Sequence, residues 1–353
     1  MWLGCTQLSI GHNLPPAMRD AQSLNRLLAP YRAPSNARGV VELAITALPF
    51  LFLFALAFVL HAYGYWWISL LVAIPAGGFM VRLFTIQHDC GHGAFFRNKL
   101  ANDWVGRALG VFTLTPYDFW RNTHAIHHSS SGNLDRRGIG DVDTLTLAEY
   151  LSRTPWRRFL YRLYRHPLVL FVLGPIYLFG IQHRLPLGLM RNGWKPWIST
   201  QATNVAIAAA AAFLMWAGGV KAFLIIYPPI MFIAACAGVW LFYVQHQFEG
   251  TVWTDNESWT FHGAALQGSS FYDLPPVLRW FTANIGIHHI HHVSSRIPYY
   301  RLPRVLRDYP DLAKIGRITM VESLKCARLT LWDEQRQRLI SFRDARRRAA
   351  EEA

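Results

Sequence analysis

Three short clusters of histidine stand out as residues that could bind metal. They run from His88 to His92, from His124 to His128 and from His288 to His292, with the spacings HxxxH, HxxHH and HxxHH. Residues three and four positions apart share one face of a helix, so each cluster directs two or three imidazoles the same way. The histidines that fit these spacings are His88, His92, His124, His127, His128, His288, His291 and His292. His289 follows His288 directly, so it points about 100° away and is expected to lie behind a ligand or to be incidental.

The eight imidazoles exceed the four ligands of a single tetrahedral zinc site. They suit two metal ions, each with several nitrogen ligands and a position left open for oxygen or water. Imidazole is a ligand of iron, zinc and copper, so the ligand type leaves the metal open. His246 lies at the end of an apolar run and is a further candidate ligand, the alternative being an interfacial histidine. Asp89, Asn284 and Glu249 are candidates to orient the imidazoles or a bound water.

Four apolar runs are long enough to position these clusters from within a membrane. They cover residues 40–62, 65–86, 197–216 and 222–244. Each is close to the ~20 residues that cross ~30 Å of hydrocarbon as a helix. Only short turns separate the first run from the second and the third from the fourth, which predicts two antiparallel hairpins. Two shorter runs, 104–114 and 168–181, are expected to be interfacial or re-entrant helices.

The composition favours a membrane protein over a nucleic-acid-binding protein. Apolar residues make up 52% of the chain and charged residues only 16%, below the roughly 25% of soluble domains. The net charge is +14, from 35 Lys and Arg against 21 Asp and Glu. Lys221 is the single cation in the two hairpin turns, and nearly all other cations lie in the segments beyond the runs. By the positive-inside rule, the N-terminus, the segment 87–196 and the C-terminal third are expected in the cytoplasm.

These observations predict an all-α integral membrane protein. Its four transmembrane helices form two hairpins, and a cytosolic helical cap holds a histidine-rich di-metal site. The expected divisions are a cytosolic N-terminal tail at residues 1–39, a membrane domain at 40–310 and a basic cytosolic C-terminal tail at 311–353. The alternative for the C-terminal segment is a basic amphipathic helix on lipid headgroups. Both termini and the site are expected on the cytoplasmic side, in a bacterial plasma membrane.

The sequence around the histidines closely resembles the sequences of one enzyme family. The matching stretches are HDCGHGAFF from His88, RNTHAIHHSSSGNLDRRGIGD from Arg121, LFYVQHQFEG from Leu241, LQGSSFYDLP from Leu266 and NIGIHHIHH from Asn284. They resemble the integral-membrane fatty acid desaturases, and most of all the bacterial and plastid-type omega-6 (delta-12) acyl-lipid desaturases. The resemblance covers roughly residues 80–305, with the three histidine boxes in the family's order.

The resemblance implies a non-haem di-iron centre, held by the eight box histidines and by His246. Such a centre uses O2 and two electrons to introduce a cis double bond into a fatty acyl chain carried by a lipid or by coenzyme A. In one branch of the family, a water-holding Asn lies four residues before the additional histidine. Phe242 occupies that position here, so this detail does not transfer. A separate electron donor is implied, such as a ferredoxin or a cytochrome b5-type protein.

Two other functions remain open on the residues alone. A fatty acyl hydroxylase, or a carotenoid hydroxylase or ketolase, would use the same scaffold, since metal ligands do not separate hydroxylation from desaturation. A histidine-rich metal transporter is the alternative outside enzymes. Transport sites place ionisable ligands near the membrane midplane, whereas these clusters lie beyond the ends of the apolar runs. The expected partners are therefore the acyl lipid, O2, the electron donor and membrane lipids, and no nucleic acid.

Overall fold

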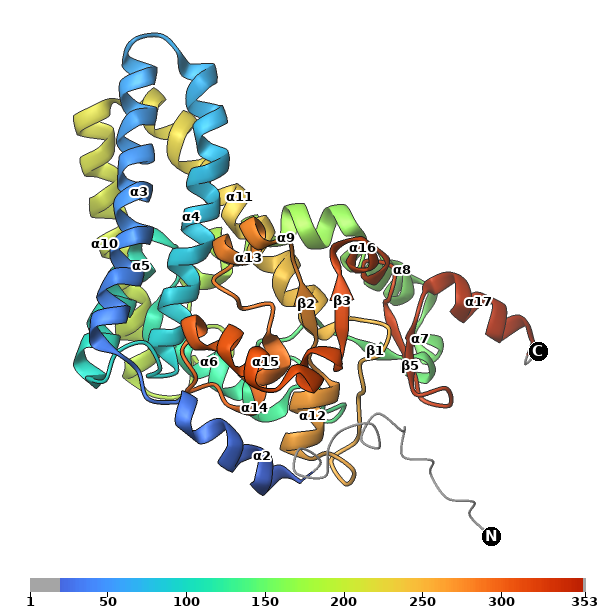
Figure 1. Ribbon diagram of the computed structural model, residues 1–353. Helices are drawn as coiled ribbons and strands as arrows, with labels where there is room; N and C mark the ends of the chain where they lie inside the picture. Colours follow the sequence, from blue (N-terminus) through green and yellow to red (C-terminus); the bar gives the residue numbers. More distant parts are fainter. Residues whose placement is uncertain (1–19, 352–353) are drawn as a thin grey trace.

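A computed structural model describes residues 20–351, and they are mostly helical (Figure 1). The part of the predicted N-terminal tail before residue 20 lies outside the described residues. Four long apolar helices form two antiparallel pairs, as the apolar runs predict. They are α3 (Asn36–Ala62), α4 (Trp66–Gly91), α10 (Trp194–Gly218) and α11 (Val220–His246). All four are long and apolar enough to cross a membrane, so the predicted fold class is confirmed.

Two of the long helices, α4 and α11, extend beyond the predicted apolar runs at their C-terminal ends. The α4 helix continues to Gly91 and α11 continues to His246, so both carry histidines out of the apolar region without a break. Gly64 and Gly219 form the turns of the two pairs with positive φ angles of 85° and 88°, a conformation that glycine adopts without a steric penalty. The α4 helix packs against both α3 and α11, which places it at the centre of the bundle.

Shorter helices build a cap at one end of the bundle. They are α2 (Ala21–Leu28), α5 (Lys99–Phe112), α6 (Tyr117–Ser130), α7 (Leu147–Ser152), α8 (Pro155–Tyr164), α9 (Gly174–Gly180), α12 (Phe261–Gln267), α13 (Pro276–Phe281), α14 (His288–Val293), α15 (Leu302–Asp308), α16 (Met320–Cys326) and α17 (Phe342–Glu351). The run 104–114 falls mostly within α5. The run 168–181 becomes a π-helical turn, Val169–Leu173, followed by α9.

Two small sheets in the cap add to the predicted helical fold. Strand β1 (Leu145–Thr146) pairs in parallel with β4 (Leu331–Asp333), which pairs antiparallel with β5 (Arg338–Ile340). Strand β2 (Phe271–Asp273) pairs in parallel with β3 (Arg317–Thr319). The strands are two or three residues long, and their partners in the parallel pairs are distant in sequence. Such short segments show no alternating polar and apolar pattern from which a strand could be predicted.

The described part of the C-terminal segment, for which a basic tail or a helix on headgroups is expected, is folded onto the cap through β3, β4 and β5. Trp332 on β4 is fully buried, and the buried Arg348 of α17 pairs with Asp333. The reason is tertiary: apolar residues of this segment pack in one cluster with residues of β1, α7 and α8. The boundaries of the three predicted divisions stay predictions.

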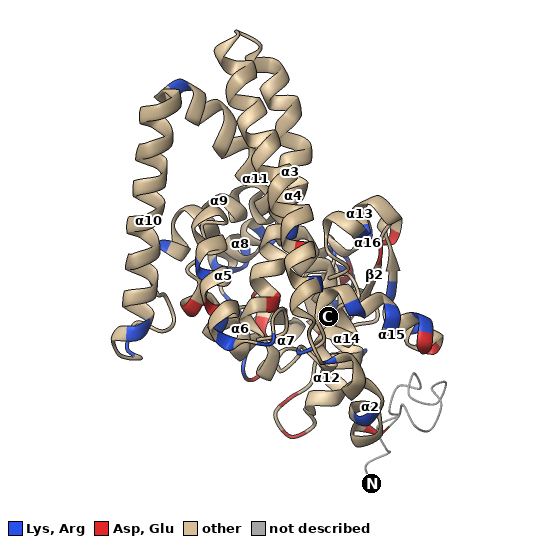
Figure 2. Ribbon diagram, turned by 60° about the vertical axis from the view of Figure 1, so that its left-hand side comes forward, with Lys and Arg blue, Asp and Glu red and all other residues tan. Residues whose placement is uncertain are grey.

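Charged residues are far more frequent in the cap than in the bundle (Figure 2). Lysine and arginine residues gather in the cap and at its junction with the bundle, while Lys221 lies in the first turn of α11, next to the hairpin turn. This distribution matches the charge pattern used above to orient the chain.

A buried ion pair lies where the bundle meets the cap, and the sequence analysis did not anticipate it. Glu42 of α3 pairs with Arg82 of α4, and both side chains are almost fully buried. Tyr299 Oη donates a hydrogen bond of 2.9 Å to Glu42 Oε2. The guanidinium of Arg82 also lies 4.2 Å from the ring centroid of Trp280 on α13. The pair therefore ties two long helices to the cap.

We expect Glu42→Gln to destabilise the protein by about 3–5 kcal/mol, because it leaves the Arg82 guanidinium buried without a counter-charge. The measurement is the free energy of unfolding in detergent micelles. Arg38→Gln is the control, since Arg38 pairs with the same carboxylate but is 57% exposed, and loss of an exposed partner costs about 0–1 kcal/mol. An equal decrease in the free energy of unfolding for the two variants would contradict a larger stabilising contribution from the buried pair.

Candidate metal centre

Four helices bring the nine predicted histidines to one place in the cap. The last turn of α4 supplies His88, and His92 caps that helix. The α6 helix supplies three histidines, the end of α11 supplies His246, and α14 supplies three more. The nine are His88, His92, His124, His127, His128, His246, His288, His291 and His292. Because their helices come from distant parts of the chain, only the tertiary fold brings them together.

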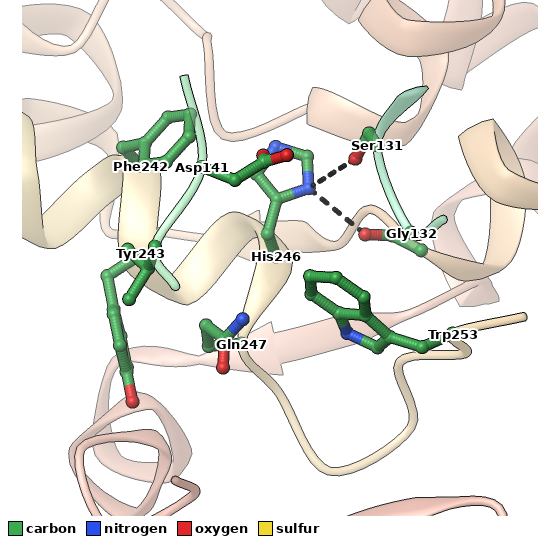
Figure 3. A pocket seen from close by; sticks show the side chains of 10 residues that line it. Ser131, Gly132, Asp141, Phe242, Tyr243, His246, Gln247 and Trp253 are labelled. Atoms are coloured by element: carbon green, nitrogen blue, oxygen red, sulfur yellow. Dashed lines mark hydrogen bonds between the residues drawn. The ribbon is translucent and has the colours of Figure 1, made fainter. Parts of the chain in front are cut away.

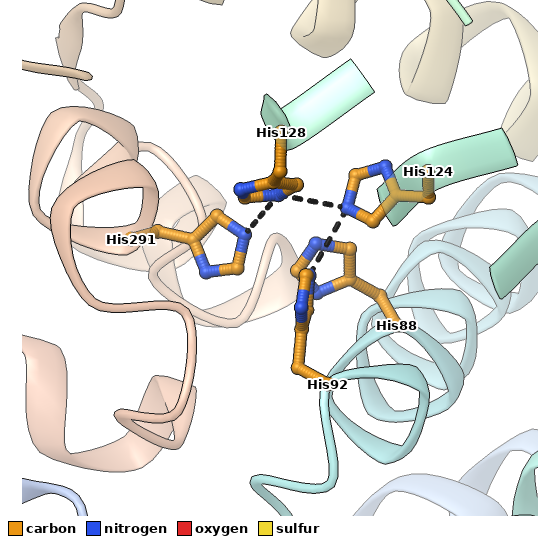
Figure 4. Close-up of side chains that lie close together, drawn as sticks. All are labelled: His88, His92, His124, His128 and His291. Atoms are coloured by element: carbon orange, nitrogen blue, oxygen red, sulfur yellow. Dashed lines mark hydrogen bonds between the residues drawn. The ribbon is translucent and has the colours of Figure 1, made fainter. Parts of the chain in front are cut away.

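Five of these histidines form a first group (Figure 4): His88, His92, His124, His128 and His291. One ring nitrogen from each lies within 4.8 Å of one from every other member. The Nε2 atoms of His92 and His124 are 3.1 Å apart, as are those of His124 and His128. The Nε2 atom of His291 lies 3.2 Å from that of His128. The nitrogens therefore converge on one point from three helices.

The other four form a second group: His127, His246, His288 and His292. Nε2 of His246 lies 3.1 Å from that of His127 and 3.0 Å from that of His288. Nε2 of His292 lies 3.0 Å from that of His288. The two groups adjoin, because the rings of His128 and His292 stack with centroids 4.1 Å apart. The arrangement matches two neighbouring metal positions.

Burial keeps these imidazoles available as ligands. It lowers the pKa of each box histidine on α14, of His92, and of His124 and His128 well below the ordinary value, and the charged forms of neighbouring histidines lower the pKa further. A neutral imidazole keeps a free nitrogen lone pair, which is the form that binds metal. The local environment therefore favours metal binding over protonation at neutral pH.

One carboxylate contacts each group from outside. Asp89, which the sequence analysis singled out, lies 3.2 Å from His88 Nδ1 and accepts a hydrogen bond of 2.7 Å from the backbone N–H of Tyr299. Asp141 Oδ1 lies 2.5 Å from His127 Nδ1, and both side chains are buried. Such carboxylates set the ring orientation and the tautomer, so that the other nitrogen faces the metal.

Sequence reasoning missed Asp141, although a signal was present. Asp141 ends the stretch RNTHAIHHSSSGNLDRRGIGD and follows Gly140. Gly140 has a φ of 75°, and a Cβ atom there would lie 3.2 Å from the Cβ of His127. A glycine that allows close approach, followed at once by a carboxylate, points to a loop folded back onto the histidine helix.

The Nδ1 atom of His246 is also held from outside the second group. It lies 3.1 Å from the carbonyl oxygen of Gly268 and 3.3 Å from Ser131 Oγ. A small cavity adjoins this contact, lined by residues that include Ser131, Asp141, Phe242 and His246 (Figure 3). The ring of Phe242 lies beside both His127 and His246, with centroids 5.1 and 5.3 Å apart. An apolar ring therefore covers one side of the second group.

Three other residues singled out from the sequence lie away from the two groups. Glu249 is exposed after the end of α11. Asn284 has a φ of 57° in the turn before α14, and its carbonyl accepts the N–H of Ile287. Within the described residues, no hydrogen bond joins either side chain to a histidine of the two groups. His289 Nε2 donates to the carbonyl of Leu312 at 2.9 Å, so this ring faces away from the metal positions, as its spacing predicts.

The donor set fits two metal ions of the imidazole-binding kind. Every residue of the two groups is a buried or half-buried histidine, a ligand that suits iron, copper and zinc. Outer contacts hold the Nδ1 atoms of His88, His127 and His246, which leaves their Nε2 atoms to face inward. Asp141 Oδ2 has no hydrogen-bond partner in the described part of the chain, so this carboxylate serves His127 alone.

Asp141→Asn is expected to weaken metal binding in the second group by about 10- to 100-fold, the usual effect of losing an outer-shell carboxylate. The amide keeps the shape of the carboxylate but removes its charge and no longer selects one tautomer of His127. Competition with a chelator measures the affinity. Asp135→Asn is the control, because Asp135 lies in the same loop and accepts the N–H of Asn256 instead. An unchanged affinity in the Asp141 variant would remove Asp141 from the site.

Comparisons with known proteins agree with this geometry. A family model described as fatty acid desaturase matches residues 65–323. A fatty acid desaturase of Bacillus subtilis is 40% identical over 322 residues, which cover 91% of each chain. The sn-1 acyl-lipid omega-3 desaturase (ferredoxin) of a Synechocystis species is 31% identical over 63% of this chain and 62% of its own. The sn-1 oleoyl-lipid 12-desaturase of a Picosynechococcus species is 26% identical over 69% of this chain and 70% of its own.

Proposed function

The chain belongs to the fatty acid desaturase family of O2-dependent oxidoreductases, and on this basis we propose that it introduces a cis double bond into a lipid-bound acyl chain at a di-iron centre. The observation that carries the proposal is the pair of adjoining histidine groups at the cap end of the candidate spans. An acyl chain anchored in the leaflet can reach a site at that end. A transport site would place its ligands near the midplane of the membrane instead.

In the proposal, each histidine group holds one iron ion. Iron in such a donor set supplies the oxidation of an unactivated C–H bond with O2 and two external electrons. The protein's own residues hold and shield the site. Asp89 and Asp141 orient the rings of His88 and His127. Trp120 stacks on His124 with centroids 4.6 Å apart, and it keeps water from one side of the first group.

We further propose that the double bond is introduced at the delta-12 (omega-6) position. The resemblance of the histidine boxes and their flanking text to that branch supports this choice, and a relative named as an oleoyl-lipid 12-desaturase matches most of the chain. The omega-3 position is the second candidate, because a relative named for it is 31% identical. Both positions use the same metal ligands, so the shape of the acyl-binding path decides between them.

Analysis of products tests the reaction and its position together. The enzyme is expressed in a host that contains oleoyl lipids and no dienes, and the double bonds are located by mass spectrometry of fatty acid derivatives. A diene with a new double bond at carbon 12 supports the delta-12 proposal. A new bond elsewhere contradicts the position only. A hydroxylated chain, or no product from iron-loaded protein, contradicts desaturation.

We propose that a separate acidic protein delivers the electrons, and that the active site faces the cytoplasm of a bacterium. A ferredoxin is favoured over a cytochrome b5-type protein, because ferredoxin appears in the name of one relative. The net charge of +14, concentrated in the cap, would attract such a donor.

Electron transfer from ferredoxin is therefore expected to slow as ionic strength rises, because salt screens charges beyond about 10 Å at 0.1 M. The measurement is the rate of product formation with reduced ferredoxin at increasing salt. Chemical reduction by dithionite serves as the control, since it involves no protein docking. A rate with ferredoxin that is independent of salt would contradict electrostatic docking.

A further inference from the structure

Helix α8 presents its apolar side to the outside of the protein. Trp156, Phe159 and Leu163 recur at the spacing of one helix face and are 65%, 53% and 47% exposed. On the opposite face, Tyr161 is buried in the cap, and Arg165 directly after the helix is buried as well. A helix on the surface of a soluble protein shows the reverse arrangement, with its apolar face toward the core. The outer face of α8 therefore needs an apolar partner.

Two helices from other parts of the chain share this feature. Val277 and Leu278 of α13 are 67% and 43% exposed, and Val321 and Leu324 of α16 are 71% and 66% exposed. In both views, which differ by a turn about the vertical axis, α8, α9, α13 and α16 lie at one level between the bundle and the rest of the cap (Figures 1 and 2). The exposed apolar residues thus form one belt, which we call the interfacial belt: the outward faces of α8, α13 and α16.

Contacts with the long helices place α13 and α16 along the bundle axis, while Arg165, directly after α8, donates a hydrogen bond to Tyr243 Oη near the end of α11. Phe79 of α4 packs against Trp280 and Phe281 of α13, nine residues before His88. Trp240 of α11, six residues before His246, donates to Tyr272 Oη, which in turn contacts Ser323 of α16. At 1.5 Å per residue, the contacts of α13 and α16 lie about 9–14 Å from the histidines, toward the hairpin turns.

The length of α11 beyond this level matches a lipid bilayer. Residues 220–239 lie between the hairpin turn and Trp240, and twenty helical residues span about 30 Å, the thickness of the hydrocarbon core. Along α11 the edge of the hydrocarbon therefore falls near Trp240. Phe79 is the fourteenth residue of α4, about 21 Å along that helix, so its contact with α13 lies within the thickness of the hydrocarbon. Apolar side chains at that level are continuous with the lipid-facing surface of the spans.

Cations flank the apolar face of α8, as is typical of helices that lie on anionic membranes. On the helix circumference, Arg157 lies to one side of the apolar face. Arg162 lies to the other side and is exposed, although its Nε donates a hydrogen bond to Tyr150 Oη of the cap. Arg153 and Arg157, with Asp143, line a surface cavity of about 410 Å³ that Leu160 also borders. Guanidinium groups are the chemistry that binds a phosphate headgroup, and here they lie beside an apolar helix face.

From this juxtaposition we propose that the interfacial belt rests in the cytosolic leaflet, with its apolar faces in the acyl region and the arginines of α8 on anionic phospholipid headgroups. The cap would then be held on the membrane by α8, α13 and α16 as well as by the four spans. The proposal rests on the packing and exposure of these helices, and it does not depend on the reaction proposed above.

Spin labels test the position of the belt. Cysteine is introduced for Leu163 or Val321 in a background without reactive native cysteines, and the full chain is placed in nanodiscs of phosphatidylglycerol and phosphatidylethanolamine. Collision with O2, which concentrates in hydrocarbon, is compared with collision with a water-soluble nickel chelate. Arg336→Cys is the control, because Arg336 is exposed in the turn between β4 and β5. All three positions are exposed, so the labels leave the core intact.

The proposal expects the ratio of O2 to nickel collisions to be high at positions 163 and 321 and low at position 336. It also expects the ratio at 163 to fall when Arg157 and Arg162 are both replaced by Gln, and to fall with both arginines in place when phosphatidylglycerol is omitted. Free access of the nickel chelate at 163 and 321 would overturn the proposal, since the belt would then lie in water. Low collision with both reagents would also overturn it, because a second protein surface would then cover the belt.

Discussion

His291→Gln is expected to abolish desaturation and to lower the iron content of the purified protein. His291 brings its Nε2 atom within 3.2 Å of that of His128 in the first histidine group. The glutamine amide is a far weaker ligand for iron than imidazole, so the group loses one of its five nitrogen donors. We expect product below detection rather than a graded loss, because the chemistry depends on the bound metal.

His289→Gln is the matched control for this experiment. It removes a histidine from the same helix and the same box, and His289 is equally buried. Its Nε2 donates to the carbonyl of Leu312, a contact that the glutamine amide can restore. Iron content, measured by elemental analysis per protein, should fall only in the His291 variant. Retained activity in that variant, or equal loss of iron in both, would remove His291 from the proposed ligand set.

His246→Gln is expected to remove iron mainly from the second group and to abolish product formation as well. His246 Nε2 lies near those of His127 and His288, whereas the first group is built from other residues. The second group has four histidines and the first has five, so loss of one donor should affect the smaller set more. We therefore expect the iron content to fall toward one ion per chain.

Iron analysis combined with Mössbauer spectroscopy measures this outcome, since the two iron environments can be counted separately. Phe242→Leu is the control, because Phe242 lies one helical turn before His246 and covers the second group without offering a ligand atom. It should keep both ions. A His246 variant that retains two ions and full activity would show that His246 only ends the α11 helix at the membrane interface.

The sequence alone identified the nine histidines of the two groups and the four spans, two of which end at histidines of these groups. The spacing of the three clusters identified eight of the nine histidines, because ligand type and helical periodicity are local properties. Apolar length identified the four spans, because the bilayer sets the length of a helix that crosses it. The end of the last run pointed to His246, since a span that stops at a histidine brings it to the same membrane level as His92.

The tertiary structure alone decided how the histidines divide. Within the second box, His124 and His128 join the first group and His127 joins the second, although all three lie on one face of α6. Within the third box, His291 joins the first group while its neighbour His292 joins the second. Helical spacing predicts only that residues three or four positions apart share a face of the helix. The position of α6 and α14 against the ends of α4 and α11 assigns each ring to a group.

Outer contacts were also decided by tertiary structure. Asp89, Glu249 and Asn284 were equal candidates by spacing, but only Asp89 contacts a histidine of the two groups in the described structure. Asp141 reaches His127 because Gly140 lets its loop approach the helix. Likewise, the sequence of α8 shows an apolar and a basic side, but burial of Tyr161 and Arg165 decides that the apolar side faces outward. A local pattern specifies which residues share a face, and only the packing of distant segments decides what that face meets.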